Sequence, residues 1–130
     1  MKTLVVICKK TGRIICLFFR NGKKHDFRLF KESQIRMLER IQVKVDTGFI
    51  GIDKFHKNSQ IPKKSSKKHP LSKEDRRNNR IISSERVLNE HVIGFIKRFK
   101  ILSERYRNRR KRFGLRFNLL AGICNFDRDI

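Results

Sequence analysis

The first twenty residues consist of two apolar runs separated by a short polar segment. Residues 3–8 and 13–19 are rich in β-branched and aromatic side chains, whereas residues 9–12 have the chemistry of a turn. This pattern predicts an antiparallel hairpin. Because both runs are continuously apolar, we expect the hairpin to be covered on both faces, as in a sheet with helices packed on it.

The segment after the hairpin is more polar and contains shorter apolar patterns. An Asn-Gly step at residues 21–22 interrupts the second run, and Asp26 is placed to cap a short helix. Residues 42–45 form a third strand-like pattern that ends at Asp46. The stretch from about residue 59 to 71 is polar and basic and holds both prolines, so we expect a flexible connector or an exposed loop there.

The second half of the chain has helical periodicity. Ser72 and Asp75 form a capping-box pattern. From there to Lys100 the sequence contains no proline, and Gly94 is its only glycine. One long helix is therefore expected over residues 72–100. Its apolar stripe, which we expect to pack on the sheet, consists of Ile81, Leu88, Val92, Phe95 and Phe99.

A second helix is predicted over about residues 114–126. Four positions recur there at helical spacing and are expected to form the buried face. They are Leu115, Leu119, Gly122 and Ile123. Together the elements indicate an α/β fold with two long C-terminal helices.

Composition narrows the class of protein and of partner. The chain has 130 residues, which suits one small domain over residues 1–130, and 38% hydrophobic residues with eleven Phe are enough for a folded core. Lys and Arg number 34 against 12 Asp and Glu, which gives a formal net charge of +22. That excess predicts binding to a polyanion such as nucleic acid.

Neither a membrane span nor a secretory leader is expected. The longest apolar runs are strand-sized, and Lys9, Lys10 and Arg13 interrupt any signal-peptide core. We therefore expect a cytoplasmic, nucleoid-associated protein. The three cysteines form no CxxC pair, and we interpret them as small apolar residues.

Candidate chemistry concentrates at one strand end and on the long helix. Asp46 follows the third strand-like pattern, while Arg86, Glu90 and Lys97 lie at i, i+4 and i+11 and project from one strip of the helix. Spacing alone leaves two interpretations of this strip open. One is a solvent-exposed salt-bridge ladder. The other is a metal-binding carboxylate, Glu90, which Arg86 orients while Lys97 reaches a phosphate.

Two motifs resemble those of a known family. Residues 46–49 read D-T-G-F and resemble the D-x-G-[YF] setting of the second catalytic Asp in DDE transposases of bacterial insertion sequences. Glu90 is similar in its setting to the catalytic Glu of that family, because Arg86 and Lys97 complete the R-x3-E-x6-K signature in register. Ser83 occupies the position of the Tyr that precedes this signature. The resemblance covers nearly the whole chain.

The resemblance implies a fold and a chemistry. The family has a ribonuclease-H-like fold, a mixed sheet in which three acidic residues hold two divalent metal ions, Mg²⁺ or Mn²⁺. By this resemblance Asp46 bridges the metals, Glu90 binds one of them, and Arg86 and Lys97 support the site and hold DNA. The implied reaction is metal-dependent cleavage and transfer of DNA strands in transposition, with transposon ends and target DNA as partners.

The first catalytic Asp of the family has no counterpart in this sequence. In the resembling proteins it lies on a strand upstream of the segment that matches residues 3–8. The resemblance therefore implies an N-terminally truncated sheet that lacks its first strand, and a catalytic triad without its third carboxylate. We expect the chain alone to be inactive and to need a complementing N-terminal fragment. A homo-oligomer on paired DNA ends is implied as well.

Several residues compete with this assignment. Glu85 lies near the apolar stripe and remains an alternative ligand, with a salt bridge to a nearby Arg as its structural interpretation. Asp26 is interpreted as a helix cap rather than a replacement ligand. The four histidines show no metal-binding spacing.

A basic run after the long helix is a second candidate for DNA binding. Its basic residues are Arg105, Arg107, Arg109, Arg110, Lys111 and Arg112. With Tyr106 and Phe113 beside it, we interpret the run as a contact to the DNA backbone, which provides affinity without base specificity. A non-catalytic nucleic-acid-binding protein, including a ribosomal one, remains the alternative function.

Overall fold

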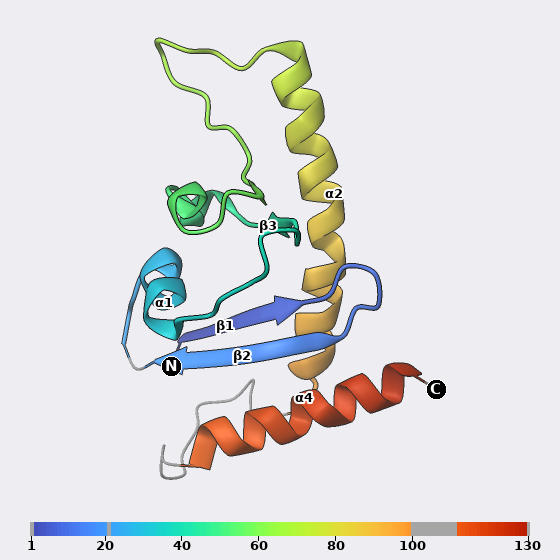
Figure 1. Cartoon of the computed structure of the whole chain (residues 1–130). Helices are drawn as coiled ribbons and strands as arrows, with labels where there is room; N and C mark the ends of the chain where they lie inside the picture. Colours follow the sequence, from blue (N-terminus) through green and yellow to red (C-terminus); the bar gives the residue numbers. More distant parts are fainter. Residues whose placement is uncertain (1, 21, 100–111, 130) are drawn as a thin grey trace. The chain divides into compact units, whose positions relative to one another are not determined.

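The chain consists of two compact units. The computed structural model describes residues 2–20, 22–99 and 112–129. The first unit comprises Met1–Arg20 and Arg86–Ile130, and the second comprises Asn21–Glu85. Each unit contains a two-stranded sheet and helical residues (Figure 1), which agrees with the expected α/β class.

The first unit begins with the predicted hairpin. Strand β1 (Lys2–Ile7) pairs antiparallel with β2 (Ile14–Arg20). The turn between them is closed by a hydrogen bond of 2.8 Å from Gly12 N to Cys8 O. Gly12 has a φ of 69°, a left-handed conformation that glycine adopts without a steric penalty, so the glycine determines where the turn ends.

One face of the hairpin packs on two helices of the same unit. These are α2 (Lys73–Ile96), through its C-terminal part, and α4 (Phe113–Asp129). The Phe19 ring lies 5.8 Å from that of Phe113 and 5.5 Å from that of Phe117, measured between centroids. The buried residues of this core are Ile14, Val92, Ile96, Phe113, Phe117, Ala121 and Cys124. Removal of their apolar surface from water stabilises the unit.

Helix α4 is present as predicted, but it buries a different face. Leu115 and Leu119 are 72% and 65% exposed, and Gly122 and Ile123 are exposed as well. The prediction of the buried face is therefore wrong. The reason is that α4 has apolar residues on two faces, and the face with the larger Phe side chains is the one that packs on Phe19.

Asn125 attaches α4 to the start of β2. Its side-chain amide donates to Ile14 O at 2.9 Å and accepts from Ile14 N at 2.8 Å. Arg128 Nη1 also donates to Gly12 O, at 3.3 Å. Because Ile14 is buried, these bonds provide partners for backbone groups that would be costly to leave unpaired.

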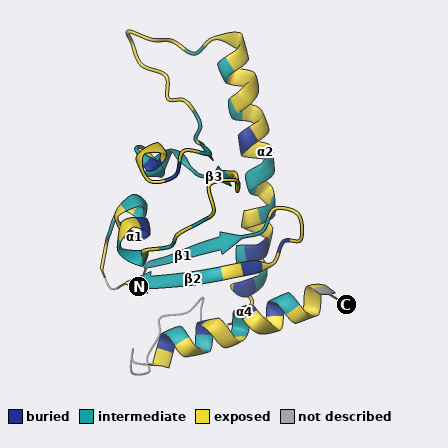
Figure 2. Cartoon of the chain, in the orientation of Figure 1, coloured by how far each residue is buried: buried dark blue, intermediate teal, exposed yellow. Residues whose placement is uncertain are grey.

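Helix α2 confirms the prediction of one long helix, although it ends at Ile96. The residues before about position 85 are mostly exposed (yellow in Figure 2), and Ile81 is 50% exposed, against expectation. Ile82 and Ile96 are buried in addition to the predicted Val92. No helix in the described part of the chain is long and apolar enough to cross a membrane.

The second unit is made of short elements. Helix α1 (Asp26–Ser33) is followed by strand β3 (Val43–Lys44), two short 3-10 helices, η1 (Thr47–Phe49) and η2 (Ile52–Lys54), and strand β4 (Ser59–Gln60). Strands β3 and β4 pair in parallel. The third strand-like pattern is thus confirmed in a shorter form. The connector predicted over about residues 59–71 begins with the two residues of β4.

Aromatic pairs and one histidine hold the second unit together. Phe30 and Phe49 meet edge to face with centroids 6.4 Å apart, which places η1 against α1. His56 is buried and donates from Nε2 to the carbonyl oxygen of Ile41 at 2.6 Å. His56 therefore has a structural role, which agrees with the interpretation of the histidines from the sequence.

All three cysteines are free thiols. Cys124 is buried and Cys8 and Cys16 are half-buried. Burial raises the pKa of the Cys16 and Cys124 thiols, and a hydrogen bond with the Thr11 side chain lowers the pKa of Cys8. The burial of Cys124 agrees with its interpretation as a small apolar residue.

Candidate active site

Asp46 lies directly after β3, where the chain turns into η1. The preceding residue, Val45, donates its N–H to Gln60 O at 3.0 Å and so extends the pairing with β4 up to the site. The Asp46 carboxylate accepts hydrogen bonds from Thr47 N (2.6 Å) and Thr47 Oγ1 (3.2 Å), which caps the 3-10 helix. A paired strand on one side and this cap on the other fix the position of the half-buried carboxylate.

A second carboxylate lies beside this turn. A Cβ atom placed on Gly48 would be 3.7 Å from Asp26 Oδ2, so Asp26 is close to the D-T-G-F segment. The helix begins at Asp26 itself, and His25 occupies the N-cap position without a side-chain hydrogen bond. The predicted capping role of Asp26 is therefore wrong. Its charge in the first turn instead interacts favourably with the positive end of the helix.

Glu85, the alternative ligand, forms an ion pair with Lys44 of β3. The two side chains are 21% and 24% exposed, so the pair is shielded from much of the solvent. An ion pair of Glu85 is thus confirmed, but this partner is a lysine of a strand and not the nearby Arg that the sequence predicts. Helical spacing could not indicate this partner, because Lys44 lies 41 residues away in another element.

The three residues of the R-x3-E-x6-K signature follow one another along α2 and into the turn after it. Arg86 is half-buried, whereas Glu90 and Lys97 are exposed. At about 100° per residue, Glu90 points away from the buried Val92 and Ile96. The Glu90 carboxylate is therefore open to solvent and ions. This placement is compatible with both interpretations that spacing left open.

Asp46 belongs to the second unit and Glu90 to the first. Both supply carboxylate oxygens, the donors that Mg²⁺ and Mn²⁺ prefer. Among the described residues, no group of three or more His, Cys, Asp or Glu side chains is arranged to hold a metal ion. The donor chemistry fits a divalent metal, while the number of clustered ligands is short of a three-carboxylate set.

Most of the basic run predicted to contact DNA lies outside the described residues. This applies to Arg105, Arg107, Arg109, Arg110 and Lys111. Arg112 is described, and it is exposed directly before α4. The role of the run in DNA binding stays a prediction.

Comparison with known proteins gives these residues a family context. Residues 1–125 match the model of a family described as DDE superfamily endonuclease. Over 127 residues the chain is 48% identical to a protein of Microchaete diplosiphon described as "Probable transposase for insertion sequence element IS702". The alignment covers 98% of this chain and 46% of that relative, so the chain spans about half the length of the curated relative. No solved structure matches the chain.

Proposed function

The chain belongs to the DDE superfamily of endonucleases, and on that premise we propose that it is part of an insertion-sequence transposase that cuts and joins DNA strands. The observation that carries the proposal is the family match over residues 1–125, which includes both Asp46 and Glu90 in their motifs. The net charge of +22 suits a protein that acts on a polyanion.

In this proposal Asp46 and Glu90 are the catalytic carboxylates that hold Mg²⁺ or Mn²⁺. When bound, the metal stabilises charge on the phosphodiester and promotes attack by water or a 3′-hydroxyl. Thr47 orients the Asp46 carboxylate in advance, which reduces the cost of binding a cation there. Arg86 of α2 and Lys97 of the turn after it hold DNA phosphates near Glu90.

The proposed fold is ribonuclease-H-like. Its support is the order of elements, with an antiparallel hairpin first, a parallel strand pair carrying Asp46 next, and a long helix carrying Glu90 last. The basic run from Arg105 to Arg112 then provides backbone contacts to transposon ends and target DNA.

We expect the chain alone to bind DNA without cleaving it. The motifs supply two carboxylates, and the family chemistry uses three. A third carboxylate is then expected outside residues 1–130, and the part of the relative that the alignment does not cover is a candidate source of it.

The test is a nicking assay on supercoiled DNA that carries the ends of the element, with Mg²⁺. The chain alone should leave the plasmid intact. The same chain, co-expressed with the unaligned part of the IS702 relative, should nick it, and Asp46→Asn or Glu90→Gln should abolish the nicking.

Asp53→Asn and Glu74→Gln are the matched controls, because both remove one exposed carboxylate of the chain. Both controls should keep the nicking activity. Nicking that survives Asp46→Asn would contradict the proposed site. DNA binding that is indifferent to metal, with no nicking in the co-expressed pair, would favour the non-catalytic alternative.

A further inference from the structure

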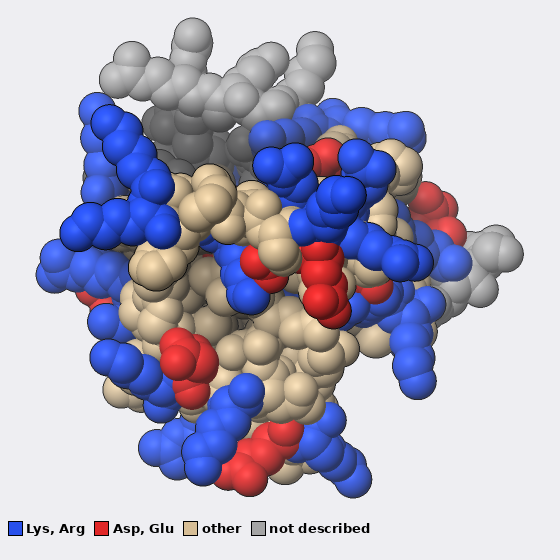
Figure 3. Space-filling model, turned by 90° about the horizontal axis from the view of Figure 1, so that it is seen from above, with Lys and Arg blue, Asp and Glu red and all other residues tan. Residues whose placement is uncertain are grey.

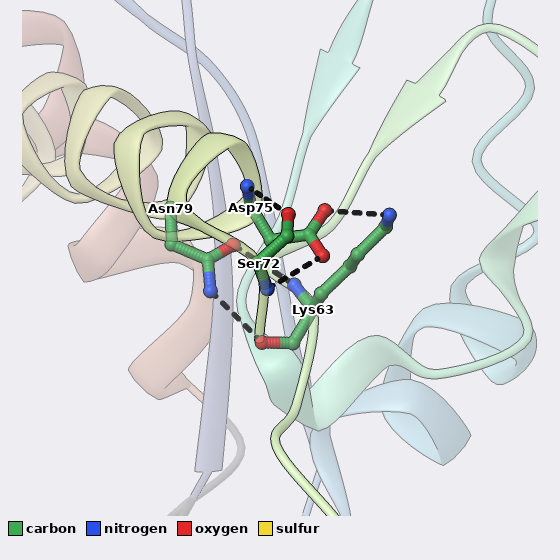
Figure 4. A network of polar contacts seen from close by, with 4 residues as sticks. All are labelled: Lys63, Ser72, Asp75 and Asn79. Atoms are coloured by element: carbon green, nitrogen blue, oxygen red, sulfur yellow. Dashed lines mark hydrogen bonds and ion pairs between the residues drawn. The ribbon is translucent and has the colours of Figure 1, made fainter. Parts of the chain in front are cut away.

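The loop before α2 is attached to the helix at a defined place. The Asn79 side-chain amide accepts from Lys63 N at 3.0 Å and donates to Lys63 O at 2.9 Å, and Lys63 Nζ bonds to Asp75 Oδ1 at 2.6 Å (Figure 4). The stretch from about residue 59 to 71, for which the composition predicts a flexible connector or an exposed loop, is therefore tied through Lys63 to the first two turns of α2. Because the pairing uses both backbone groups of Lys63, it also fixes which side of the helix faces the loop.

Two further pairs of hydrogen bonds order the same region. Asp75 N donates to Ser72 Oγ at 3.0 Å and Ser72 N donates to Asp75 Oδ2 at 3.3 Å, which forms the capping box that the sequence predicts. Within the loop, His69 N donates to Ser66 Oγ at 3.0 Å, and Ser66 N donates to His69 O at 3.1 Å. The start of α2 is thereby fixed.

The side of α2 away from the loop carries a stripe of cations. At about 100° per residue, the loop-facing Asp75 and Asn79 and the buried Ile82 lie within about 60° of one another. The positions at i, i+3, i+4 and i+7 from Lys73 lie within about 100° of one another, and all four are exposed. Lys73, Arg77 and Arg80 lie at least about 100° from both Asp75 and Asn79, and Arg76 lies at the edge of the stripe nearer the loop. This basic stripe consists of Lys73, Arg76, Arg77 and Arg80.

The stripe concentrates charge of one sign on the helix. Like charges at i and i+4 repel, so the pairs Lys73–Arg77 and Arg76–Arg80 weaken an isolated helix. Of the two carboxylates in the first turn, Asp75 faces the loop and is bonded to Lys63 and Ser72. Further cations, Lys64, Lys67 and Lys68, are exposed in the loop itself. Lys and Arg side chains (blue) spread widely over the face drawn in Figure 3.

On the premise that the protein acts on DNA, we propose that the basic stripe binds the phosphate backbone of duplex DNA, in addition to the contacts proposed for the basic run of residues 105–112. The stripe extends about 10 Å along the helix, seven residues at 1.5 Å each, a length that matches about three base-pair steps of one strand. Residues 61–80 contain no aromatic side chain on which an unpaired base could stack, apart from the imidazole of His69. The stripe therefore offers no stacking platform for an unpaired base, whereas its exposed cations suit the phosphate oxygens of a duplex.

The test is the salt dependence of DNA binding by the full chain, without metal, on a 20-base-pair duplex of arbitrary sequence. The variant Arg76→Gln, Arg77→Gln, Arg80→Gln should raise Kd by at least about ten-fold at 150 mM salt. The negative slope of log K against log salt should also become shallower, by about 0.9 for each phosphate that the protein no longer neutralises. Circular dichroism checks that the helix content is kept.

The matched control removes the same charge elsewhere in the second unit, as Lys23→Gln, Lys54→Gln, Lys57→Gln. All three lysines are exposed. The control should change Kd and the salt slope far less than the stripe variant. Equal effects of the two variants would overturn the proposal, because binding would then follow net charge alone. Tighter binding of an RNA duplex than of the DNA duplex would overturn the assignment to DNA.

A second variant tests the loop attachment without removing charge. Asn79→Ala breaks both bonds to Lys63 and should weaken DNA binding at least about three-fold, because the DNA must then order the start of α2. Asn78→Ala, the exposed neighbouring position, is its control and should bind as the unchanged chain does. Identical binding by the two Asn variants would show that the loop attachment does not serve the stripe. Since these assays contain no metal, they are decided independently of the nicking assay.

Discussion

Asp75 takes part in two contacts that hold the start of α2, the ion pair with Lys63 and the capping box with Ser72. It is 21% exposed, accepts from Lys63 Nζ and also belongs to the capping box of α2. The hydrogen bonds from Lys63 and then from Ser72 hold the pKa of the Asp75 carboxyl below its ordinary range. The bond to Asp75 raises the pKa of the Lys63 ammonium in turn. The ionised forms of Asp75 and Lys63 therefore both favour attachment of the loop to α2.

We predict that the loop detaches from α2 in acid. The pKa of Asp75 is lowered on folding, so its contribution is present above the unfolded-state pKa and is lost as the pH falls through the lower folded value, below about pH 4. The raised pKa of Lys63 has the opposite sign, and its contribution is lost only as the pH rises through the raised folded value, above about pH 10. NMR signals of the Lys63 amide and of the Asn79 side chain should therefore be constant between about pH 5 and 9 and should shift in acid.

Asp75→Asn is the control for this titration. It removes the titrating group, so the acid shift of the two signals should disappear. An acid transition that persists in the variant would assign the change to another group.

At the scale of elements, α4 is defined by two apolar faces with different surroundings. Phe113, Phe117, Ala121 and Cys124 pack in the core of the first unit, whereas Leu115, Leu119 and Phe126 are exposed. A helix that is apolar all round is normally buried on every side. Only one of the two faces of α4 is covered by the described part of the chain.

We predict that substitutions on the two faces differ strongly in cost. Phe117→Ala should lower the free energy of unfolding by about 3–5 kcal/mol, because it removes a buried ring from contact with Phe19 and Phe113. Leu119→Ala should change it by about 0.5 kcal/mol or less, since that side chain is mostly in solvent. Urea unfolding, followed by circular dichroism, measures both. Equal costs, or a larger cost for Leu119→Ala, would mean that α4 packs through its other face.

At the scale of the whole molecule, the net charge of +22 dominates any encounter with a partner. Lys and Arg side chains are exposed in both units, and the loop and first turns of α2 carry many of them. A protein with this charge attracts DNA over distances of about one Debye length, 8–10 Å at physiological salt. The acidic residues of the candidate site oppose that attraction.

We predict that DNA binding by the chain is steeply dependent on salt and insensitive to removal of the acidic residues. Contact with six to ten phosphates would reduce affinity by about 10³ to 10⁵ between 50 and 200 mM salt. The double variant Asp46→Asn, Glu90→Gln should bind DNA as tightly as the unchanged chain or more tightly, because it removes two negative charges. Fluorescence anisotropy titrations at several salt concentrations measure both. A slope near zero would mean that charge is not the main source of binding.

The residues of the candidate site were selected from local signals in the sequence, and their catalytic role stays a prediction. Asp46 follows a strand pattern in a D-T-G-F setting, and Arg86, Glu90 and Lys97 share one strip of a continuous helical pattern. The partner of Glu85 was not predictable. Lys44 belongs to a strand 41 residues away, and no local periodicity encodes such a distance.

Patterns in the sequence correctly predict the hairpin, the long helix with its capping box, the C-terminal helix and the family, since each depends on neighbours within a few residues or on short motifs. The tertiary structure decided which face of α4 is buried, that Asn125 holds β2, and that Asn79 fastens the loop at Lys63. These contacts join segments 16 to 111 residues apart. Which of two apolar faces or which of several asparagines makes such a contact depends on shape and packing across the fold, and a pattern along the chain does not contain that information.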